Sequence, residues 1–400
     1  MTEVRSYAAV TAAYWAFTLT DGALRMLVLL HFHRLGFSPI DLAFLFLLYE
    51  VMGIVTNLVG GWVGARYGLR LTLFAGLAVQ IVALGLLSLT DPAWTLGLSV
   101  AYVMACQALS GVAKDLTKMS SKAAVKGVAG EGVLFKWVAL LTGSKNALKG
   151  VGFFLGGVLL SGLGFVGALW SMAGMLAVVL VAALGSLRGD LGKAKAKVRG
   201  ADVFSKNRAI NWLSAARVFL FASRDVWFVV GVPIFLSSQM GWDFHQVGGF
   251  MAVWVIGYGL VQAAVPKLLR GTVDAASGAR AARLWGGLLM LLPAGLAVGM
   301  HLAPSAALLI GGLLVFGVVF AMNSAVHSYL IVAYSDADKV ALNVGFYYSA
   351  NAVGRLGGTL LSGVVYQLAG LEATLWVSAA LVGLAFAFTL PLGGRAPARP

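Results

Sequence analysis

Apolar residues occur along this chain in long stretches that are separated by short polar segments. A helix needs about 20 apolar residues to cross a hydrocarbon core of about 30 Å, so these stretches predict membrane-spanning helices. The predicted spans cover residues 8–33, 40–65, 71–90, 95–117, 133–162, 165–187, 209–237, 245–266, 284–302, 305–333, 341–369 and 372–391. The pattern therefore predicts an all-α integral membrane protein with twelve transmembrane helices.

Lysines and arginines concentrate in alternate connections. One set, which includes both termini, holds Arg66, Arg70, the charged run 188–208 and most other basic residues outside the spans, whereas the opposite set holds only Arg34. Short connections that are rich in Lys and Arg stay in the cytoplasm. We therefore expect a multi-pass protein of the inner (cytoplasmic) membrane with both termini in the cytoplasm.

Composition agrees with a lipid environment, because 60% hydrophobic and 11% charged residues are too apolar to give a soluble domain its polar surface. The net charge of +14 would suit a nucleic-acid partner, but its position in the connections favours a role in topology, and we expect no nucleic-acid binding. The single cysteine, Cys106, excludes an internal disulfide and a multi-thiolate metal site within one chain. No nucleophile–base or metal constellation is apparent, so we predict neither an enzyme nor a cofactor. His31 and His33 lie two apart on a helix, hence on different faces, and predict no metal site.

The two halves of the chain repeat each other at a nearly constant offset. Asp21 matches Asp225 at an offset of 204, and NALKG from Asn146 matches NAVGR from Asn351 at 205. We predict a six-helix bundle over 1–187, a basic cytoplasmic linker over 188–208, a second bundle over 209–391 and a cytoplasmic tail over 392–400. Two pseudo-symmetric, parallel six-helix bundles with a central substrate site describe the major facilitator fold.

A connection after the second span supports this fold. GWVGARYGLR, from Gly61 to Arg70, resembles the cytoplasmic loop motif of the major facilitator superfamily at Gly61, Arg66, Gly68 and Arg70. The resemblance implies that these four residues form a gating motif. Ala65 occupies the motif's acidic position, so the usual charge relay is in doubt while the tight turn remains.

Nine charged residues fall well inside the predicted spans, away from the span ends, where each costs roughly 2.5–3.5 kcal/mol or more. The cations are Arg25, Lys145, Lys149, Arg217, Arg224 and Arg355, and the acids are Asp21, Glu50 and Asp225. Cations therefore exceed acids by three, and an excess of cations in hydrocarbon requires a counter-ion. The simplest counter-ion is an anionic substrate.

The spacing of these cations favours anion contact. Lys145 and Lys149 are four apart and share a helix face beside Asn146, and Arg355 occupies the place of Lys149 in the second half within one residue. Lys149 could instead reach a membrane interface with its long side chain, as could Arg217, which lies closer to the start of its span. We predict a substrate-binding set of Arg25, Lys145, Asn146, Lys149, Arg217, Arg224, Tyr347, Asn351 and Arg355.

The three acids have a role in coupling or in charge balance. Asp21 and Arg25 are four apart, so they could simply pair within one helix. Glu50 could carry a proton or form a salt bridge with a cation of the cavity. Further polar residues of the spans, His327 and Gln107 among them, offer hydrogen bonds to an oxyanion, although each alone is more typical of a helix contact. His327 could also titrate near neutral pH.

Long strings over almost the whole chain resemble one family, the ArsJ organoarsenical efflux permeases of bacteria. These strings are FTLTDGALRMLVLLHFHRLG from Phe17, ALSGVAKDLTKMSSK from Ala108, LTGSKNALKGVGFFLGG from Leu141, DLGKAKAK from Asp190 and RDVWFVVGVPIF from Arg224. The resemblance implies export of 1-arseno-3-phosphoglycerate and resistance to arsenate. It also implies functional dependence on the glyceraldehyde-3-phosphate dehydrogenase that makes this substrate from arsenate.

Other functions remain open at this stage. An organophosphate/phosphate exchanger of the same fold would also use basic residues, and would require a counter-anion on the opposite face. A proton-coupled drug exporter would have a mainly apolar or acidic cavity, which the excess of cations disfavours. A membrane sensor or scaffold without transport is the alternative from another class, and it predicts no flux.

Overall fold

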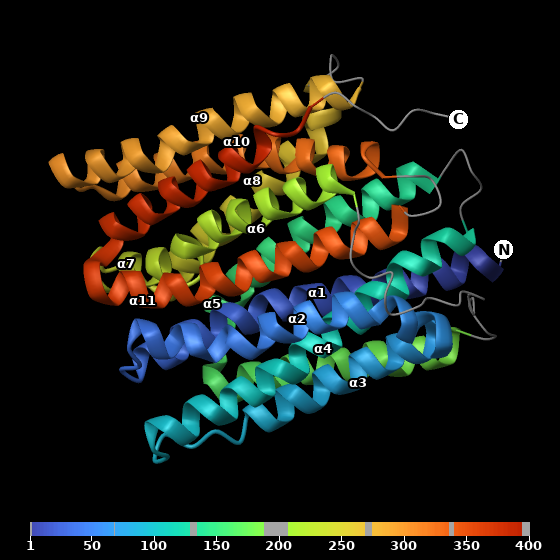
Figure 1. The fold of residues 1–400 in the computed structure, drawn as a ribbon. Helices are drawn as coiled ribbons and strands as arrows, with labels where there is room; N and C mark the ends of the chain where they lie inside the picture. The colour runs from blue at the N-terminus through green and yellow to red at the C-terminus, as the bar shows by residue number, and fades with distance from the viewer. Residues whose placement is uncertain are drawn as a thin grey trace, which may run out of the picture. The chain divides into compact units, whose positions relative to one another are not determined.

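A computed structural model describes residues 2–67, 69–128, 134–187, 207–268, 274–335 and 340–393. Side chains are described over the narrower ranges 8–57, 70–118, 144–187, 207–265, 274–335 and 343–393. Throughout these ranges the regular structure is helical, as the apolar periodicity predicts (Figure 1). The helices are α1 (Thr2–Arg34), α2 (Pro39–Tyr67), α3 (Leu69–Leu87), α4 (Leu96–Val128), α5 (Leu134–Ser186), α6 (Arg208–Phe228), α7 (Gly231–Ser238), α8 (Phe244–Leu268), α9 (Ala275–Leu302), α10 (Ala306–Ala333) and α11 (Val340–Thr389).

Two of these helices are twice the length of one membrane crossing. α5 has 53 residues and α11 has 50, but each contains a glycine with positive φ, Gly164 at 69° and Gly370 at 73°. This backbone conformation is open to glycine and costly for other residues, so the helix breaks there. Each long helix therefore supplies two spans, which end and begin where the apolar pattern predicts.

The length of the apolar stretches confirms the predicted fold class. Nine stretches in the described part of the chain are long and apolar enough to cross a membrane. Two of them, of 43 and 47 residues, are the two-span segments of α5 and α11, and a third of 31 residues joins α6 to the short α7. The span expected at 8–33 falls on α1, which is not among these nine stretches. The described residues thus form an all-α, multi-pass membrane protein.

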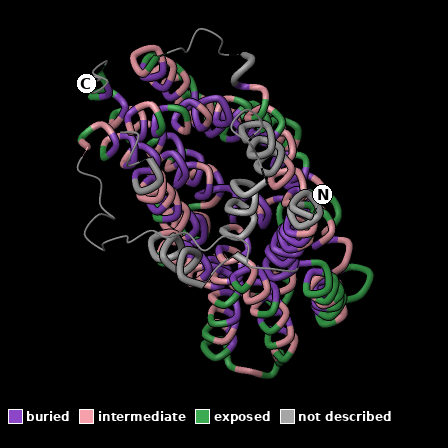
Figure 2. The backbone as a smooth tube through the Cα atoms, turned by 90° about the vertical axis from the view of Figure 1, so that its right-hand side faces the viewer, coloured by how far each residue is buried: buried purple, intermediate pink, exposed green. Residues whose placement is uncertain are grey.

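Helix surfaces carry the burial pattern of a protein in lipid. Along most helices buried and exposed positions alternate within a turn or two (Figure 2), so each helix packs through one face. Many exposed positions are large and apolar, for example Val178 at 71%, Leu302 at 76% and Leu368 at 77% exposure. Apolar side chains on an outer helix face are stable in hydrocarbon and unfavourable in water.

Contacts divide the chain into two compact units. Unit 1 comprises 1–37, 44–198 and 243–256, and unit 2 comprises 38–43, 199–242 and 257–400. In unit 1, α1 packs along α5 and α3 along α4, and in unit 2, α6 packs along α11 and α9 along α10 (Figure 1). The predicted bundle boundaries at 187, 208 and 391 remain a prediction.

Glycines bring the central helix pair of each unit into backbone contact. A Cβ atom at Gly22 of α1 would lie 2.5 Å from the Lys149 carbonyl oxygen of α5, and in unit 2 a Cβ atom at Gly358 of α11 would lie 2.8 Å from the Ala222 carbonyl oxygen of α6. Small residues permit such approach in membrane helices, where van der Waals packing drives association. The approach holds Asp21 beside α5 and Asp225 beside α11.

Candidate functional site

Three helices of unit 1 meet at the carboxylate of Asp21. The Tyr49 hydroxyl of α2 donates a hydrogen bond to Asp21 Oδ1 at 2.6 Å, and Lys149 Nζ of α5 lies 3.7 Å from Asp21 Oδ2. Asp21 is 7% exposed and the Lys149 side chain 18%, so this ion pair lies within the unit. Two residues that the sequence assigns to different roles, substrate binding and charge balance, are therefore paired here.

Arg25, which lies one turn beyond Asp21 on α1, has a different acidic partner, Glu50 of α2. Its Nη1 atom lies 3.3 Å from Glu50 Oε1, and its guanidinium carbon lies 5.2 Å from the centre of the Phe46 ring. The pairing of Asp21 with Arg25 inside α1, one of the two alternatives from the sequence, is not the one adopted, because each side chain turns to a different neighbouring helix. Glu50 is 1% exposed and serves as counter-ion to Arg25.

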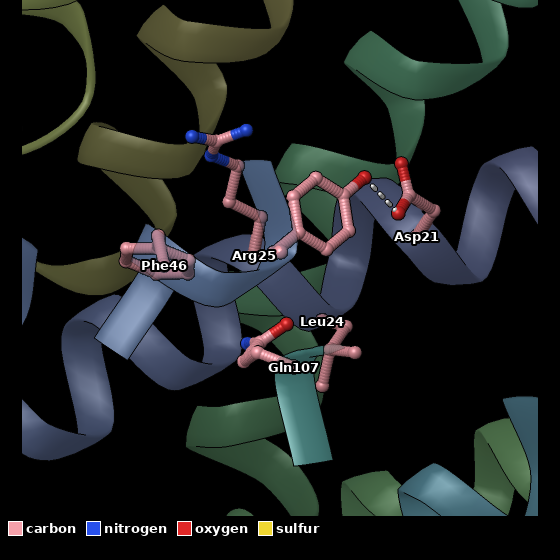
Figure 3. A pocket seen from close by; sticks show the side chains of 6 residues that line it. Asp21, Leu24, Arg25, Phe46 and Gln107 are labelled. Atoms are coloured by element: carbon pink, nitrogen blue, oxygen red, sulfur yellow. Dashed lines mark hydrogen bonds between the residues drawn. The ribbon is translucent and has the colours of Figure 1, made fainter. Parts of the chain in front are cut away.

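These groups line a small pocket of unit 1. Its lining consists of Asp21, Leu24, Arg25, Phe46, Tyr49 and Gln107 (Figure 3). In Figure 3 the Asp21 carboxylate and the Arg25 guanidinium point to different sides of the pocket. A pocket with both a cation and an acid suits a ligand that can replace one partner of an ion pair.

Lys145 and Asn146 lie on α5 about one turn before Lys149. Both side chains are partly buried. Next to them, Ser144 Oγ accepts a hydrogen bond from the Trp15 indole at 2.9 Å, which ties this part of α5 to α1. The structure therefore places both residues on the helix that carries Lys149, and their role in binding remains a prediction.

One buried acid escaped the sequence analysis. Asp115 of α4 has 0% exposure, accepts a hydrogen bond from Thr56 and lies 3.4 Å from Lys118 Nζ, which also donates to Asn57 at 3.1 Å. The fourth span was expected to end at 117, and the apolar stretch of α4 does end at Lys118, so Asp115 fell at the end of a span, although the helix itself continues to Val128. An acid inside the sequence AKDLTK, with a lysine on either side, was the available signal.

The second group of site residues surrounds Arg217 in unit 2. Arg217 of α6 is 4% exposed, so its side chain is enclosed within unit 2. Its Nε donates to Asn351 Oδ1 of α11 at 3.1 Å, and its Nη1 donates to the carbonyl oxygen and to Oγ of Ser324 of α10, at 3.1 and 3.0 Å. Every hydrogen-bond acceptor of Arg217 among the described residues is therefore a neutral oxygen.

Aromatic rings complete the surroundings of Arg217. The guanidinium carbon lies 4.1 Å from the Phe221 ring centre and 4.9 Å from that of Tyr347. The Tyr258 hydroxyl lies 3.3 Å from Ser324 Oγ. Ring faces attract cations, but they do not supply the full negative charge that a buried guanidinium needs.

Asp225 pairs with the two other arginines of the predicted binding set that lie in unit 2. Arg224 forms a close ion pair with Asp225, and Arg355 Nε lies 3.6 Å from Asp225 Oδ2. Asp225 is 1% exposed, while Arg224 and Arg355 side chains are 15% and 19% exposed. The pair of Asp225 with Arg355 repeats the pair of Asp21 with Lys149, as the internal repeat implies.

The gating motif is described only in part. Gly61 and Arg66 lie on α2, but their side chains are outside the described residues, as is Gly68 altogether. Arg70, on the first turn of α3, places its guanidinium carbon 5.4 Å from the Phe74 ring centre. The gating role of these residues remains a prediction.

The described residues of both units thus offer cations, paired acids and neutral hydrogen-bonding groups. They contain no group of three or more His, Cys, Asp or Glu side chains arranged to hold a metal ion. Guanidinium and ammonium groups bind oxyanions through charge-assisted hydrogen bonds. The arrangement is therefore suited chemically to binding anions.

Solved structures share this fold. A bacterial homologue of the iron transporter ferroportin, in an inward-facing state, matches with a TM-score of 0.72 and 16% identity, over 98% of this chain and 99% of that one. The nucleoside transporter NupG matches with a TM-score of 0.76 and 15% identity, over 97% and 99%. At such identities the likeness concerns the fold alone. No match was found among curated proteins.

A family model decides the classification. The model of the Major Facilitator Superfamily matches residues 8–273, which is more than half of the chain. The match begins in α1 and ends just before α9, so it includes α2 to α8 and all of α1 except its first six residues. The chain is a membrane transporter that belongs to the major facilitator superfamily.

Proposed function

We propose that this transporter exports an arsenylated organophosphate anion, 1-arseno-3-phosphoglycerate, from the bacterial cytoplasm and thereby confers resistance to arsenate. The proposal joins the resemblance to the ArsJ permeases with the cationic groups of the two units. The observation that carries it is the environment of Arg217, a buried cation whose described partners are all neutral.

Arg217 differs from the other arginines of the spans. Arg25 pairs with Glu50, and Arg224 and Arg355 share Asp225. A buried charge without an opposite charge is costly, and removal of one partner from a buried pair costs about 3–5 kcal/mol. A bound anion would relieve this cost at Arg217, so the empty transporter is poised to bind one.

The proposed substrate matches these groups chemically. It carries a phosphate, an acyl arsenate and a hydroxyl group, and so presents several oxyanion oxygens to bind. Planar guanidinium groups bind such oxygens with two parallel hydrogen bonds, and lysines bind them as point charges. In this proposal the anion is held by Arg25, Lys145, Lys149, Arg217, Arg224 and Arg355, with hydrogen bonds from Asn146, Tyr347 and Asn351.

The acids balance charge when no substrate is bound. Asp21, Glu50 and Asp225 each lie within ion-pair distance of a proposed substrate ligand. An arriving anion would compete with these carboxylates, and its release would restore the ion pairs. The binding groups therefore need not remain as bare cations during the return step of alternating access.

Membrane potential favours export of such an anion. Each negative charge that leaves a negative cell interior gains about 2.3 kcal/mol per 100 mV. Export therefore needs no proton gradient, provided that the protein's own charges do not cancel the charge that moves. The proposed location is the inner membrane, with both termini in the cytoplasm, as the distribution of Lys and Arg predicts.

Uptake into inside-out vesicles tests the proposal. Vesicles receive arsenate alone or arsenate with glyceraldehyde-3-phosphate, NAD and the dehydrogenase that forms the arsenylated phosphoglycerate. We expect arsenic uptake only with the complete dehydrogenase system, and a large loss of uptake in Lys149→Ala and Arg355→Ala. Arg280→Ala, at an exposed arginine of α9, is the matched control and should transport normally.

Two results would contradict the proposal. Normal transport by both Lys149→Ala and Arg355→Ala, at normal expression, would exclude the proposed set of anion ligands. Uptake of arsenate or phosphate without the dehydrogenase, with a strict requirement for a counter-anion on the other face, would favour the organophosphate/phosphate exchanger.

A further inference from the structure

A buried histidine of unit 2 has two ring nitrogens that no contact of the described residues explains. His327 of α10 has 0% exposure, and neither Nδ1 nor Nε2 has a hydrogen-bond partner among the described residues. A buried polar group without a partner costs about 1–3 kcal/mol. A buried histidine without hydrogen bonds therefore needs an explanation, because leucine or phenylalanine would fill the same volume without the cost of an unpaired polar group.

Helix periodicity places His327 beside the Arg217 site. Ser324 and His327 are three apart on α10, and Tyr347 and Asn351 are four apart on α11, so each pair shares one helix face. Arg217 hydrogen-bonds Ser324 and Asn351, one member of each pair.

The two remaining members lie at the same level. α10 ends at Ala333 and α11 begins at Val340, so His327 and Tyr347 are each one turn from the Arg217 contacts in the direction of the segment that joins these helices. Tyr347 faces Arg217 directly, with its ring centre 4.9 Å from the guanidinium carbon, and the Arg217 charge also acts electrostatically on His327.

One terminal nitrogen of the Arg217 guanidinium is left to bind a ligand. Nε and Nη1 of Arg217 are engaged with Asn351 and Ser324, whereas Nη2 donates no hydrogen bond within the described residues. An oxyanion bound to this nitrogen would bring acceptor oxygens among groups that include an imidazole N–H without an acceptor.

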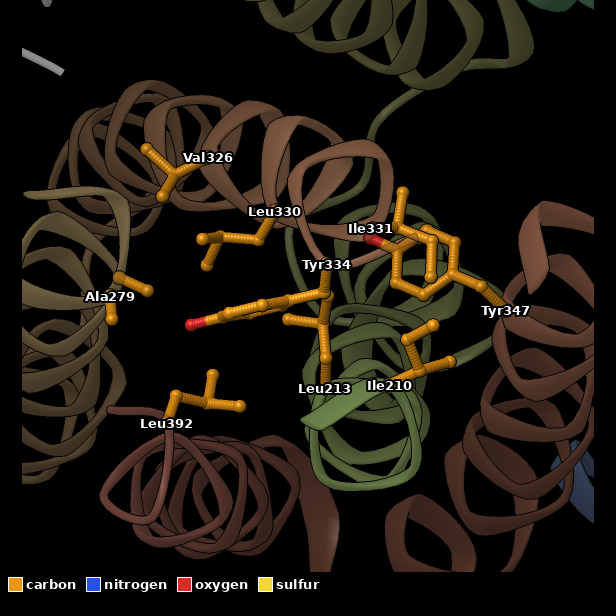
Figure 4. Close-up of a cluster of buried hydrophobic side chains, with 10 residues drawn as sticks. Ile210, Leu213, Ala279, Val326, Leu330, Ile331, Tyr334, Tyr347 and Leu392 are labelled. Atoms are coloured by element: carbon orange, nitrogen blue, oxygen red, sulfur yellow. The ribbon is translucent and has the colours of Figure 1, made fainter. Parts of the chain in front are cut away.

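Apolar residues close the site on one side. Tyr347 belongs to a buried cluster that includes Ile210, Leu213, Leu330 and Ile331, at the start of α6, the end of α10 and the start of α11 (Figure 4). Water is therefore excluded from this side of the site. In such surroundings a hydrogen bond to an anion is stronger than in water, and an unpaired imidazole is correspondingly costly.

We propose that His327 binds the substrate by donating a hydrogen bond to an oxyanion oxygen that Arg217 also holds. The inference rests on the proposed function and deepens it, since it assigns one oxyanion group of the substrate to a site made by α6, α10 and α11. The chemistry that it recognises is shared by phosphate and arsenate groups, because both present tetrahedral oxygens with a negative charge.

Binding of stable phosphate compounds tests this role. The full chain is purified in detergent, and the Kd for 3-phosphoglycerate and for inorganic phosphate is measured together with the midpoint of thermal unfolding. The variants are His327→Leu, which removes both ring nitrogens, and His327→Gln, which keeps an N–H donor. His301→Leu, at an exposed histidine on α9, is the matched control.

The expected result separates a ligand from a structural residue. His327→Leu should weaken binding about ten- to hundredfold, the effect of one lost hydrogen bond to a charged group, while the unfolding midpoint of the empty protein stays equal or rises. His327→Gln should retain most of the affinity, and His301→Leu should bind as the wild type does.

Distinct failures identify which inference is wrong. If the wild type binds 3-phosphoglycerate or phosphate and His327→Leu binds it equally well, His327 is not a ligand, and the proposed function is unaffected. If His327→Leu lowers the unfolding midpoint and His327→Gln loses binding as well, the residue is structural. If the wild type binds neither compound, the proposed function fails and this inference fails with it.

Discussion

The ion pair of Arg25 and Glu50 gives the most informative test of charge balance in unit 1. Glu50→Gln keeps the size of the side chain and removes its charge, which leaves Arg25 without the carboxylate 3.3 Å from its Nη1 atom. Glu50 is 1% exposed and Arg25 9%, so water compensates little of the loss. Breaking a buried pair by removing one partner costs about 3–5 kcal/mol, and we expect the lower end because the glutamine oxygen still accepts a hydrogen bond.

An added anion should reverse much of this loss. A ligand at 100 times its Kd stabilises the folded state by about 2.7 kcal/mol, which is close to the expected cost. In Glu50→Gln an anion no longer competes with the carboxylate for Arg25. Phosphate or 3-phosphoglycerate should therefore raise the unfolding midpoint of this variant more than that of the wild type.

Thermal unfolding in detergent, followed by tryptophan fluorescence with and without 3-phosphoglycerate, measures both effects. Glu372→Gln is the matched control, since Glu372 forms an exposed pair with His301 at 3.1 Å and exposed pairs contribute little to stability. The reasoning is refuted if Glu50→Gln unfolds at the same temperature as Glu372→Gln, or if the anion shifts the midpoints of Glu50→Gln and the wild type equally.

Further changes test the packing and the second unit. Gly152→Leu places side-chain atoms against the backbone of α1 and should abolish a monodisperse peak in size-exclusion chromatography. Gly174→Leu, where no heavy atom lies within 4 Å of the added Cβ, should keep this peak. Equal yields of monodisperse protein from the two variants would contradict the close contact. Asp225→Asn removes the carboxylate that Arg224 and Arg355 share, and should lower the unfolding midpoint by the equivalent of about 3–5 kcal/mol. Adding Arg355→Gln should restore part of the lost stability. Purely additive losses in the double variant would show that Asp225 and Arg355 are not coupled. Arg217→Lys removes the planar guanidinium that contacts Ser324 and Asn351, and should reduce arsenic uptake into vesicles at least about tenfold without loss of folded protein. Normal uptake by this variant would exclude Arg217 as an anion ligand.

Helix segments could be predicted because hydropathy acts locally. A stretch of about 20 apolar residues is stable in a membrane only as a helix, whose backbone groups are all paired within the segment. Even the breaks at Gly164 and Gly370 fall in the predicted gaps at 163–164 and 370–371. The apolar stretch of α4, at 96–118, agrees with the predicted span at 95–117, whereas the helix itself continues to Val128, because a polar helical extension has no hydropathic signal.

The identity of the charged residues could also be predicted, but their partners could not. Sequence spacing offered Asp21 and Arg25 as a pair, whereas each pairs with a residue of another helix. Spacing along one helix defines which side chains share a face, but not which neighbouring helix that face contacts. Asp115 was missed for a related reason, because its burial depends on the packing of α4 against α2.

The sequence by itself determined that this protein is a membrane transporter built from two repeated halves, because hydrophobicity, positive charge and the repeat offset are properties of the chain. Only the tertiary structure decided which cations are already neutralised. It gives Arg25, Lys149 and Arg355 acidic partners from other helices, and it pairs Arg224 with its neighbour Asp225. Among the described residues, Arg217 hydrogen-bonds only neutral oxygens and the ring nitrogens of His327 have no hydrogen-bond partner. The physical reason is that electrostatic energies in a membrane protein depend on distances between helices, and these distances are set by close packing at residues such as Gly22 and Gly358.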